Sequence, residues 1–296
     1  MEFFAGIDGG GTKTALECRD RQGRVLLRQT FGPFNFNSIG AERFDRLLEE
    51  LTAALAALGT CAGLCAGAAG ISNPRVREHF SRAMDRAGIA RWSLVGDQEI
   101  ALYGALEGEA GCGVIAGTGS ICFGRDGAGR TARAGGWGHL LDDEGSGYAL
   151  GRDALSAVLR QWDGRGPETL LTRLVSEKLG AGGPGDIVAY AYAGDKSRIA
   201  AIAPLTEQAA RAGDGVAAAI LEKGGRELAL QVRAVAGALG LRVAPVALMG
   251  GLLAHDTGLR RALTERLAVE RPDLNCIAPK QDAAAGAAMM ARKLAE

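Results

Sequence analysis

Short apolar segments and longer amphipathic segments follow one another along the chain, a pattern typical of α/β proteins. The region 41–58 shows the helical pattern most clearly, because apolar residues recur every three or four positions with charged residues between them. The predicted strands cover residues 3–7, 15–18, 24–28, 63–70, 92–96, 112–116, 121–124, 243–249 and 276–278. The predicted helices cover residues 41–58, 74–87, 98–106, 148–159, 167–179, 187–192, 197–212, 215–238, 258–267 and 283–294.

A glycine-rich tip separates the first two predicted strands, where residues 8–14 read Asp-Gly-Gly-Gly-Thr-Lys-Thr. Consecutive glycines allow positive φ angles and let the backbone approach a ligand closely. The N–H groups of such a tip, with the hydroxyls of Thr12 and Thr14, can form a concavity that binds a phosphate group. For three glycines alone, a simple turn is the alternative interpretation.

Asp8 ends the strand before this tip, where its carboxylate would repel a bare phosphate. Its position makes chemical sense when Mg²⁺ lies between the two, bound directly or through water. The tip differs from a Walker loop, because Thr12 precedes Lys13 where that motif has glycine, and no helical pattern follows directly. It also differs from G-x-G-x-x-G, which lies between a strand and a helix. The sequence therefore points away from P-loop and Rossmann folds.

A second tip, Gly-Thr-Gly-Ser at residues 117–120, lies between the predicted strands 112–116 and 121–124. A meander that occurs twice predicts two related α/β domains that face each other across a cleft. Because the chain contains 45 glycines, chance placement is the alternative explanation for this repeat.

Two further glycine-containing segments carry candidate chemistry. Residues 135–147 are too rich in glycine and acidic residues for the interior of an element, and a tryptophan among glycines indicates a functional loop. Gly250 and Gly251 follow the predicted strand 243–249, where another backbone or a flat ligand can approach closely.

The composition is that of an ordinary globular protein of about two domains, with 296 residues, 47% hydrophobic and 23% charged. The 34 basic and 34 acidic residues balance, so we expect no nucleic-acid or membrane partner held by net charge. No segment resembles a signal peptide or a membrane span, and we expect a cytoplasmic protein. The six cysteines form no CxxC pair and the three histidines are dispersed, so buried or free thiols are expected rather than a zinc site.

Taken together, these motifs resemble the N-acetylglucosamine kinase branch of the BadF/BadG/BcrA/BcrD ATPase family over nearly the whole chain. The motifs that carry the resemblance are the two tips, Gly135-Gly-Trp-Gly-His139 followed by Asp143-Glu-Gly-Ser146, and Met249-Gly-Gly251. The family belongs to the actin, hexokinase and Hsp70 superfamily. The resemblance implies an α/β protein with two ribonuclease-H-like domains of the actin-like ATPase fold, and a homodimer. The expected domains are residues 1–108, completed by the helix 283–296, and residues 109–282.

The resemblance further implies transfer of a phosphoryl group from ATP, with Mg²⁺, to the 6-hydroxyl of N-acetylglucosamine. Asp97 corresponds to the family's catalytic base, and Asp8 to the partner of the metal ion. Because a predicted helix follows Asp97 directly, helix capping is the alternative role for this residue. The implied contacts to ATP are Gly10, Gly11, Thr12, Lys13, Thr118, Ala210, Gly250 and Gly251. The implied contacts to the sugar are Asn35, Asp97, Ser120, Gly136, Trp137, Gly138, His139, Leu140 and Asp143.

Three other functions stay open at this point. Ile121 stands where some family members have an Asn that touches the sugar, which leaves glucosamine as an alternative substrate. An ATPase activator of a radical dehydratase is a different class of function, which would need cysteines placed to hold an iron–sulfur cluster. A sugar sensor without catalysis is the third alternative, although Asp8 and Asp97 are retained.

Overall fold

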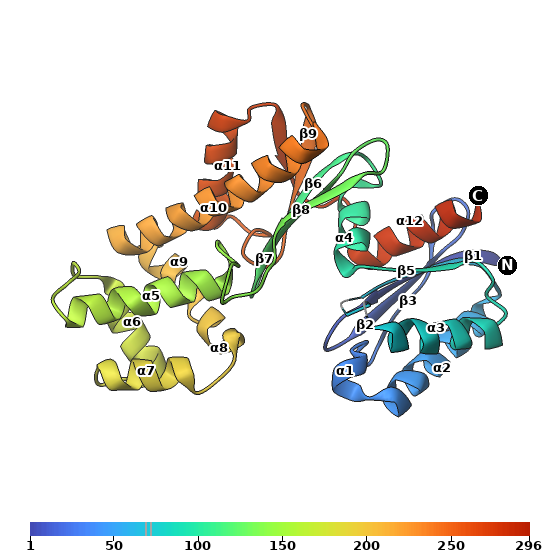
Figure 1. Ribbon diagram of the computed structural model, residues 1–296, viewed down its shortest axis with the longest axis horizontal. Helices are drawn as coiled ribbons and strands as arrows, with labels where there is room; N and C mark the ends of the chain where they lie inside the picture. Colours follow the sequence, from blue (N-terminus) through green and yellow to red (C-terminus); the bar gives the residue numbers. More distant parts are fainter. Residues whose placement is uncertain (69, 72) are drawn as a thin grey trace. The chain divides into compact units, whose positions relative to one another are not determined.

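The chain folds into two compact units, each built on one mixed β-sheet (Figure 1). The computed structural model describes residues 1–68, 70–71 and 73–296. The first unit comprises Met1–Glu109 and Pro279–Glu296, and the second comprises Ala110–Ala278. The α/β fold class expected from the sequence is confirmed.

The first unit contains a sheet with the strand order β3-β2-β1-β4-β5. Its strands are β1 (Glu2–Gly9), β2 (Thr14–Arg19), β3 (Val25–Phe31), β4 (Thr60–Ala68) and β5 (Trp92–Val95). Its helices are α1 (Phe36–Ile39), α2 (Ala41–Leu58), α3 (Pro74–Arg86), α4 (Asp97–Leu106) and α12 (Ala283–Ala295). The antiparallel meander β1–β3 is extended by β4 and β5, which run parallel to β1. Position 69, at the end of the predicted strand 63–70, lies outside the described residues.

Helices cover both faces of this sheet. Helices α2 and α3 pack on the face formed by Phe3, Ala5 and Ile7 of β1, in the larger hydrophobic cluster of the unit. Alternate residues of β1 point to the other face, where Phe4 packs with residues of α4 and α12. Because side chains alternate along a strand, Asp8 belongs to this second face.

The contacts of α12 with the sheet and with α4 depend on small residues. A Cβ atom added to Gly6 would lie 2.2 Å from the carbonyl oxygen of Ala284, and one added to Gly286 would lie 2.2 Å from that of Ile100. The helix at the end of the chain is rich in small residues, and these allow its close packing.

The second unit contains a sheet with the order β10-β9-β6-β7-β8, and a larger set of helices. Its strands are β6 (Gly111–Ala116), β7 (Ser120–Arg125), β8 (Thr131–Gly135), β9 (Ala244–Met249) and β10 (Leu274–Ile277). Its helices are α5 (Gly147–Trp162), α6 (Leu170–Leu179), α7 (Pro184–Tyr192), α8 (Lys196–Ala200), α9 (Ala203–Arg211), α10 (Gly215–Leu239) and α11 (Gly258–Glu270). Helix α10 packs its buried side against the sheet, while α5, α6, α7 and α9 share a separate helical core.

The two sheets have the same topology. In each, an antiparallel meander of three strands is followed by two strands that join its first strand in parallel. The repeat that the two glycine tips indicated is therefore confirmed at the level of strand order, with β1 equivalent to β6 and β2 to β7.

Local differences from the predicted elements have clear causes. The predicted helix 197–212 is wrong, because the chain forms α8 and α9 with a break before Pro204, which lacks an N–H group and lies in the first turn of α9. The edge strand β8 and the short helix α1 were not predicted. Both contain few buried apolar positions, so the hydrophobic pattern carries little signal there.

Candidate functional site

The first glycine tip is a tight hairpin between β1 and β2. The N–H group of Gly10 donates a hydrogen bond to the carbonyl oxygen of Lys13 at 3.0 Å. A Cβ atom on Gly10 would lie 2.9 Å from that same oxygen, whereas Gly11 has open space around it. Gly11, Thr12 and Lys13 are exposed. The tip therefore presents its backbone and the Thr12 hydroxyl to solvent, as a phosphate-binding turn requires.

The loop that follows β3 is tied to this tip. The N–H group of Phe34 donates to the carbonyl oxygen of Gly10 at 2.9 Å, and the Thr14 hydroxyl donates to that of Gly32 at 2.6 Å. Phe34 is buried against Phe44. The next residue, Asn35, is exposed and precedes α1 without capping it through its side chain. The Asn35 side-chain amide is thus held near the tip and is not used to cap the helix.

Asp8 sits in an electrostatically unfavourable place for a carboxylate. Burial raises its pKa above the ordinary value, and the negative charges of Asp97 and then Asp282 raise it further, while Lys13 lowers it. Asp282 caps α12, with its carboxylate accepting a hydrogen bond from the N–H group of Ala285. A cation beside Asp8 would relieve this repulsion.

Asp97 lies at the same edge of the sheet as Asp8. The register of the parallel strands aligns Asp8 with Gly67 and Gly67 with Val95, and Asp97 follows two residues later. Asp97 is exposed at the first position of α4, where its carboxylate accepts a hydrogen bond from the N–H group of Gln98 at 2.9 Å. Carboxyl ends of parallel strands gather ligand-binding groups in this way.

The alternative role of Asp97 as the helix cap is wrong. Gly96 occupies the N-cap position of α4, and its N–H group donates to the carboxylate of Glu99 at 3.1 Å. Glu99 therefore satisfies a backbone donor at this helix start. Asp97 is thus not the cap residue, although its carboxylate binds the N–H group of Gln98 in the first turn of the helix.

The groups around Asp8 suit a magnesium ion that takes few of its ligands from the protein. Among the residues that the structure describes, no group of three or more His, Cys, Asp or Glu side chains is arranged to hold a metal ion. Magnesium commonly binds through one or two carboxylates together with water and substrate phosphates. Asp8 beside an open phosphate-binding turn suits that arrangement, and a closed protein cage is not required.

The second glycine tip, between β6 and β7, is anchored to the start of α5. The N–H group of Gly117 donates to the carbonyl oxygen of Gly119 at 2.9 Å. The first N–H groups of α5 bind the tip in turn, since Gly147 donates to Gly117 at 2.7 Å and Tyr148 donates to Thr118 at 3.2 Å. Thr118 itself is exposed. This turn therefore has a rigid base and an open hydroxyl.

Ser120 and Asp143 lie beneath this tip, and each is only 3% exposed. The N–H group of Ser120 donates to the Asp143 carboxylate at 3.3 Å, and the Ser120 hydroxyl donates to the carbonyl oxygen of Glu144 at 2.7 Å. A Cβ atom on Gly119 would lie 3.0 Å from both carboxylate oxygens of Asp143. Both residues were predicted to contact sugar, and here they support the tip.

One oxygen of Asp143 is left over. Within the described part of the chain, its Oδ2 atom is buried without a hydrogen-bond partner. The Nζ atom of Lys196, at the start of α8, lies 3.8 Å from it. Asp143 also has a left-handed backbone, with φ of 65°. A buried acceptor with spare capacity is the kind of group that a ligand hydroxyl satisfies.

The loop between β8 and α5 presents the predicted aromatic and glycine residues. Gly136 and Gly138 have positive φ angles, and Trp137 between them is 66% exposed. The His139 ring packs edge-on to Tyr148, with centroids 4.8 Å apart, while Leu140 is exposed. The structure thus keeps the residues 136–140 together on one open loop.

Of the residues predicted to line the adenosine side, Gly250 and Gly251 lie beside the second tip. Strand β9 runs parallel to β6, and a Cβ atom on Gly250 would lie 2.3 Å from the carbonyl oxygen of Ala116. Ala210 lies on α9 and lines a separate groove of about 730 Å³ with residues of α10 and α11. The lining of that groove includes neither glycine.

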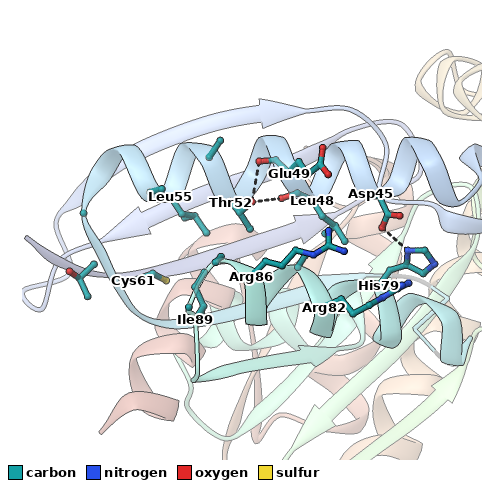
Figure 2. A pocket seen from close by; sticks show the side chains of 17 residues that line it. Asp45, Leu48, Glu49, Thr52, Leu55, Cys61, His79, Arg82, Arg86 and Ile89 are labelled. Carbon is teal, nitrogen blue, oxygen red and sulfur yellow. Dashed lines mark hydrogen bonds and ion pairs between the residues drawn. The ribbon is translucent and has the colours of Figure 1, made fainter.

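Another groove, shown in Figure 2, contains none of the predicted site residues. It has a volume of about 470 Å³ and lies between α2 and α3, where the Nδ1 atom of His79 and a carboxylate oxygen of Asp45 are 2.5 Å apart. These helices cover the face of the sheet opposite to that of Asp8. The groove is therefore separate from the candidate site of this unit.

Sequence reasoning missed three charged residues that the fold brings to the site. Asp282 lies close enough to Asp8 to raise its pKa, Lys196 faces Asp143, and Arg133 stacks on Trp137. Asp282 and Lys196 are distant in sequence from the residues they face. Arg133 is near Trp137 in sequence, but the pattern gave no indication of the stacking.

Two general features bear on the alternatives. Among the described residues, no helix has the length and apolar character needed to cross a membrane.

Cys112 and Cys122 are buried in the core of the second unit, where their thiols interact with each other. They are therefore not placed to bind an exposed iron–sulfur cluster.

Comparison with known proteins places the chain among sugar kinases and ATPases. It is 37% identical to an N-acetylmuramic acid/N-acetylglucosamine kinase of Clostridium acetobutylicum over 99% of both chains. It is 29% identical to an N-acetyl-D-glucosamine kinase of Dictyostelium discoideum over 98% of both chains. The solved structure of a candidate N-acetylglucosamine kinase from Chromobacterium violaceum matches with a TM-score of 0.75, 32% identity and 99% coverage of both chains. Residues 5–291 match the family model, and the chain belongs to the BadF/BadG/BcrA/BcrD ATPase family.

Proposed function

We propose that the protein is an ATP-dependent kinase that phosphorylates the 6-hydroxyl of N-acetylglucosamine. The observation that carries this proposal is the placement of Asp97, which is exposed, is not needed as the helix cap, and shares a sheet edge with Asp8 and the first tip. A kinase needs such a carboxylate near its phosphate-binding turn. The similarity to kinases of N-acetylated amino sugars supports the same conclusion.

In this proposal, Thr12 and Thr118 donate hydrogen bonds to the phosphates of ATP, and Asp8 binds Mg²⁺ through water or directly. When bound, the metal ion neutralises charge that develops on the phosphates. Gly250 and Gly251 provide close backbone approach for the nucleotide. Ala210 is assigned to the adenosine side on the family resemblance alone.

Asp97 has the chemical role in the transfer. Its carboxylate accepts the proton of the sugar 6-hydroxyl while the new bond from oxygen to the γ-phosphorus forms and the bond to ADP breaks. Asn35 and the loop 136–140 bind the sugar hydroxyls and the acetamido group. Asp143, with its spare buried oxygen, accepts a further sugar hydroxyl and keeps Ser120 in place.

A coupled assay of ADP release tests the proposal. We would compare N-acetylglucosamine, glucosamine, glucose, N-acetylmannosamine and N-acetylmuramic acid in the presence of Mg-ATP. Strong turnover with N-acetylglucosamine supports the proposal, and preference for glucosamine would replace its substrate. Equal background rates with all five sugars, despite measurable ATP binding, would contradict a sugar kinase and favour a sensor. Sedimentation of the same sample tests the homodimer that the family resemblance implies.

A further inference from the structure

A stacked pair of side chains, Arg133 and Trp137, stands at the edge of the loop 136–140. The Cζ atom of Arg133 lies 3.9 Å from the centroid of the Trp137 ring. Both side chains are exposed, and Arg133 belongs to β8, the edge strand of its sheet. A guanidinium group at this distance is attracted by the negative face of the indole ring, which restricts its orientation.

Arg133 differs from the other cationic side chains in this region, which lie beside acidic side chains. Arg130 pairs with Asp126 at 2.6 Å, Arg152 with Glu144 at 3.2 Å, and Lys196 faces Asp143. The guanidinium group of Arg133 stacks on Trp137 and forms no ion pair or hydrogen bond with the residues that the structure describes. Its N–H groups are therefore available to a ligand.

Asp142, the acidic residue of the loop that binds Trp137, does not neutralise Arg133. Its Oδ2 atom accepts a hydrogen bond from the backbone N–H group of Trp137 at 3.1 Å. This bond holds the backbone of the tryptophan and not the guanidinium group. The guanidinium group of Arg133 is therefore open to an acidic ligand.

The backbone fixes where the pair stands. Gly136 has a left-handed backbone, with φ of 73°, which favours glycine, and the chain passes close to Ile121 of β7 there. Ala132 and Ala134 pack against the core of the unit. Because side chains alternate along β8, Arg133 points to the other face of the sheet.

We propose that Arg133 binds a carboxylate carried by the sugar, so that the enzyme accepts acidic N-acetylated amino sugars, N-acetylmuramic acid among them. This inference rests on the proposed function and on the loop 136–140 as part of the sugar site. A guanidinium group stacked on a ring keeps the N–H edge in its plane open, and that edge matches a carboxylate with two parallel hydrogen bonds. N-acetylmuramic acid carries its carboxylate on the lactyl ether and keeps its 6-hydroxyl free.

The test compares kcat/KM for N-acetylmuramic acid and N-acetylglucosamine in four proteins. These are the wild type, Arg133→Met, Arg133→Lys and, as the matched control, Arg130→Met, which removes a guanidinium group from the turn between β7 and β8. In Arg133→Met, kcat/KM for N-acetylmuramic acid divided by kcat/KM for N-acetylglucosamine falls by about 10-fold to 100-fold. Arg133→Lys gives a smaller fall, because charge remains and the paired geometry is lost. Arg130→Met keeps the wild-type ratio.

Calorimetric titration of the two sugars into the nucleotide-free protein gives a second readout, independent of turnover. The inference is supported when Arg133→Met weakens binding of N-acetylmuramic acid more than that of N-acetylglucosamine. It is overturned when both sugars lose affinity equally, or when the wild type binds and phosphorylates N-acetylglucosamine alone. In that last case the proposed kinase function stands, whereas absence of turnover with every sugar would instead remove the proposed function.

Discussion

Asp97 combines an exposed carboxylate with freedom from helix capping, which Gly96 and Glu99 perform. We expect Asp97→Asn to reduce kcat by about 100-fold to 10,000-fold, because an amide cannot take up the proton of the attacking hydroxyl. The coupled ADP-release assay measures the loss, and calorimetry checks that the sugar still binds. Glu99→Gln is the matched control two residues away, and it retains a side-chain acceptor for the helix start. Equal losses in both variants would contradict the role of Asp97 as base.

Asp8 illustrates a site residue that costs stability. Its pKa is raised by burial first and by Asp97 second, so the folded protein holds this proton more tightly than the unfolded chain does. Stability therefore falls as the pH rises from the ordinary pKa of 3.8 through the raised value, and it stays lower at neutral pH. We expect Asp8→Asn to raise the melting temperature at pH 7, with no gain below pH 3.8.

Asp126→Asn is the control of opposite sign for that experiment. A hydrogen bond from Arg130 holds the pKa of Asp126 below its ordinary value, so its stabilising effect is present at neutral pH and is lost as the pH falls. Thermal melts across pH then separate the two cases. A lower melting temperature for Asp8→Asn at pH 7 would show that the Asp8 carboxylate does not destabilise the ligand-free protein.

Among the elements, α12 fits closely against its neighbours. A Cβ atom on Gly286 would lie 2.2 Å from the Ile100 carbonyl oxygen and 2.5 Å from the Gly104 nitrogen, so α12 and α4 have no room for a methyl group. We expect Gly286→Ala to lower the free energy of unfolding by about 1–3 kcal/mol or more, because backbone has to move. Denaturant titration measures the change.

Gly237 provides the opposite case on α10, since nothing lies within 4 Å of its Cβ position. Gly237→Ala should raise the free energy of unfolding by about 0.5–1 kcal/mol, because alanine favours the helix and meets no neighbour. If both alanine variants were stabilised alike, the close packing of α12 would not be required.

At the same scale, sequence patterns predicted most elements with buried faces and missed those without them. The amphipathic pattern of α2 predicted its full length, because five of its apolar residues are buried in the unit's core. Strand β8 alternates exposed Thr131 and Arg133 with half-buried Ala132 and Ala134, and because its inward residues are only alanines, the apolar signal was too weak to mark it. Pro204 was a visible signal for the break between α8 and α9, and the helical prediction overlooked it.

For the molecule as a whole, the first unit is discontinuous in sequence. The chain leaves the first unit after Glu109 and returns to it at Pro279. These two points are neighbours, because Lys280 forms ion pairs with Glu107 at 3.5 Å and with Glu109 at 3.3 Å. Because α12 supplies part of the second hydrophobic cluster, residues 1–109 alone leave that face of the sheet covered only by α4.

We therefore expect residues 1–109 joined to 279–296 by a short glycine-serine linker to unfold cooperatively in a thermal melt. Residues 1–109 alone should show no cooperative transition, because Phe4, Cys65 and Ile100 lose their partners on α12. The continuous segment 110–278, with its own core, serves as the control that folds without a partner segment. Cooperative unfolding of 1–109 alone would contradict this account of α12.

The sequence by itself determined the features that depend on neighbours along the chain. The glycine tips, the strands beside them and the amphipathic helices are readable because turn residues and hydrophobic periods act locally. The order of these motifs was sufficient to indicate the family, which the match over residues 5–291 confirmed.

Only the tertiary structure decided which groups face one another across the sheets and helices. The burial of Asp143 under Gly119, its approach to Lys196, and the charges that surround Asp8 follow from strand register and helix packing between distant segments. Electrostatic and steric effects depend on distances in space, and a linear pattern contains these only where the contacts are local.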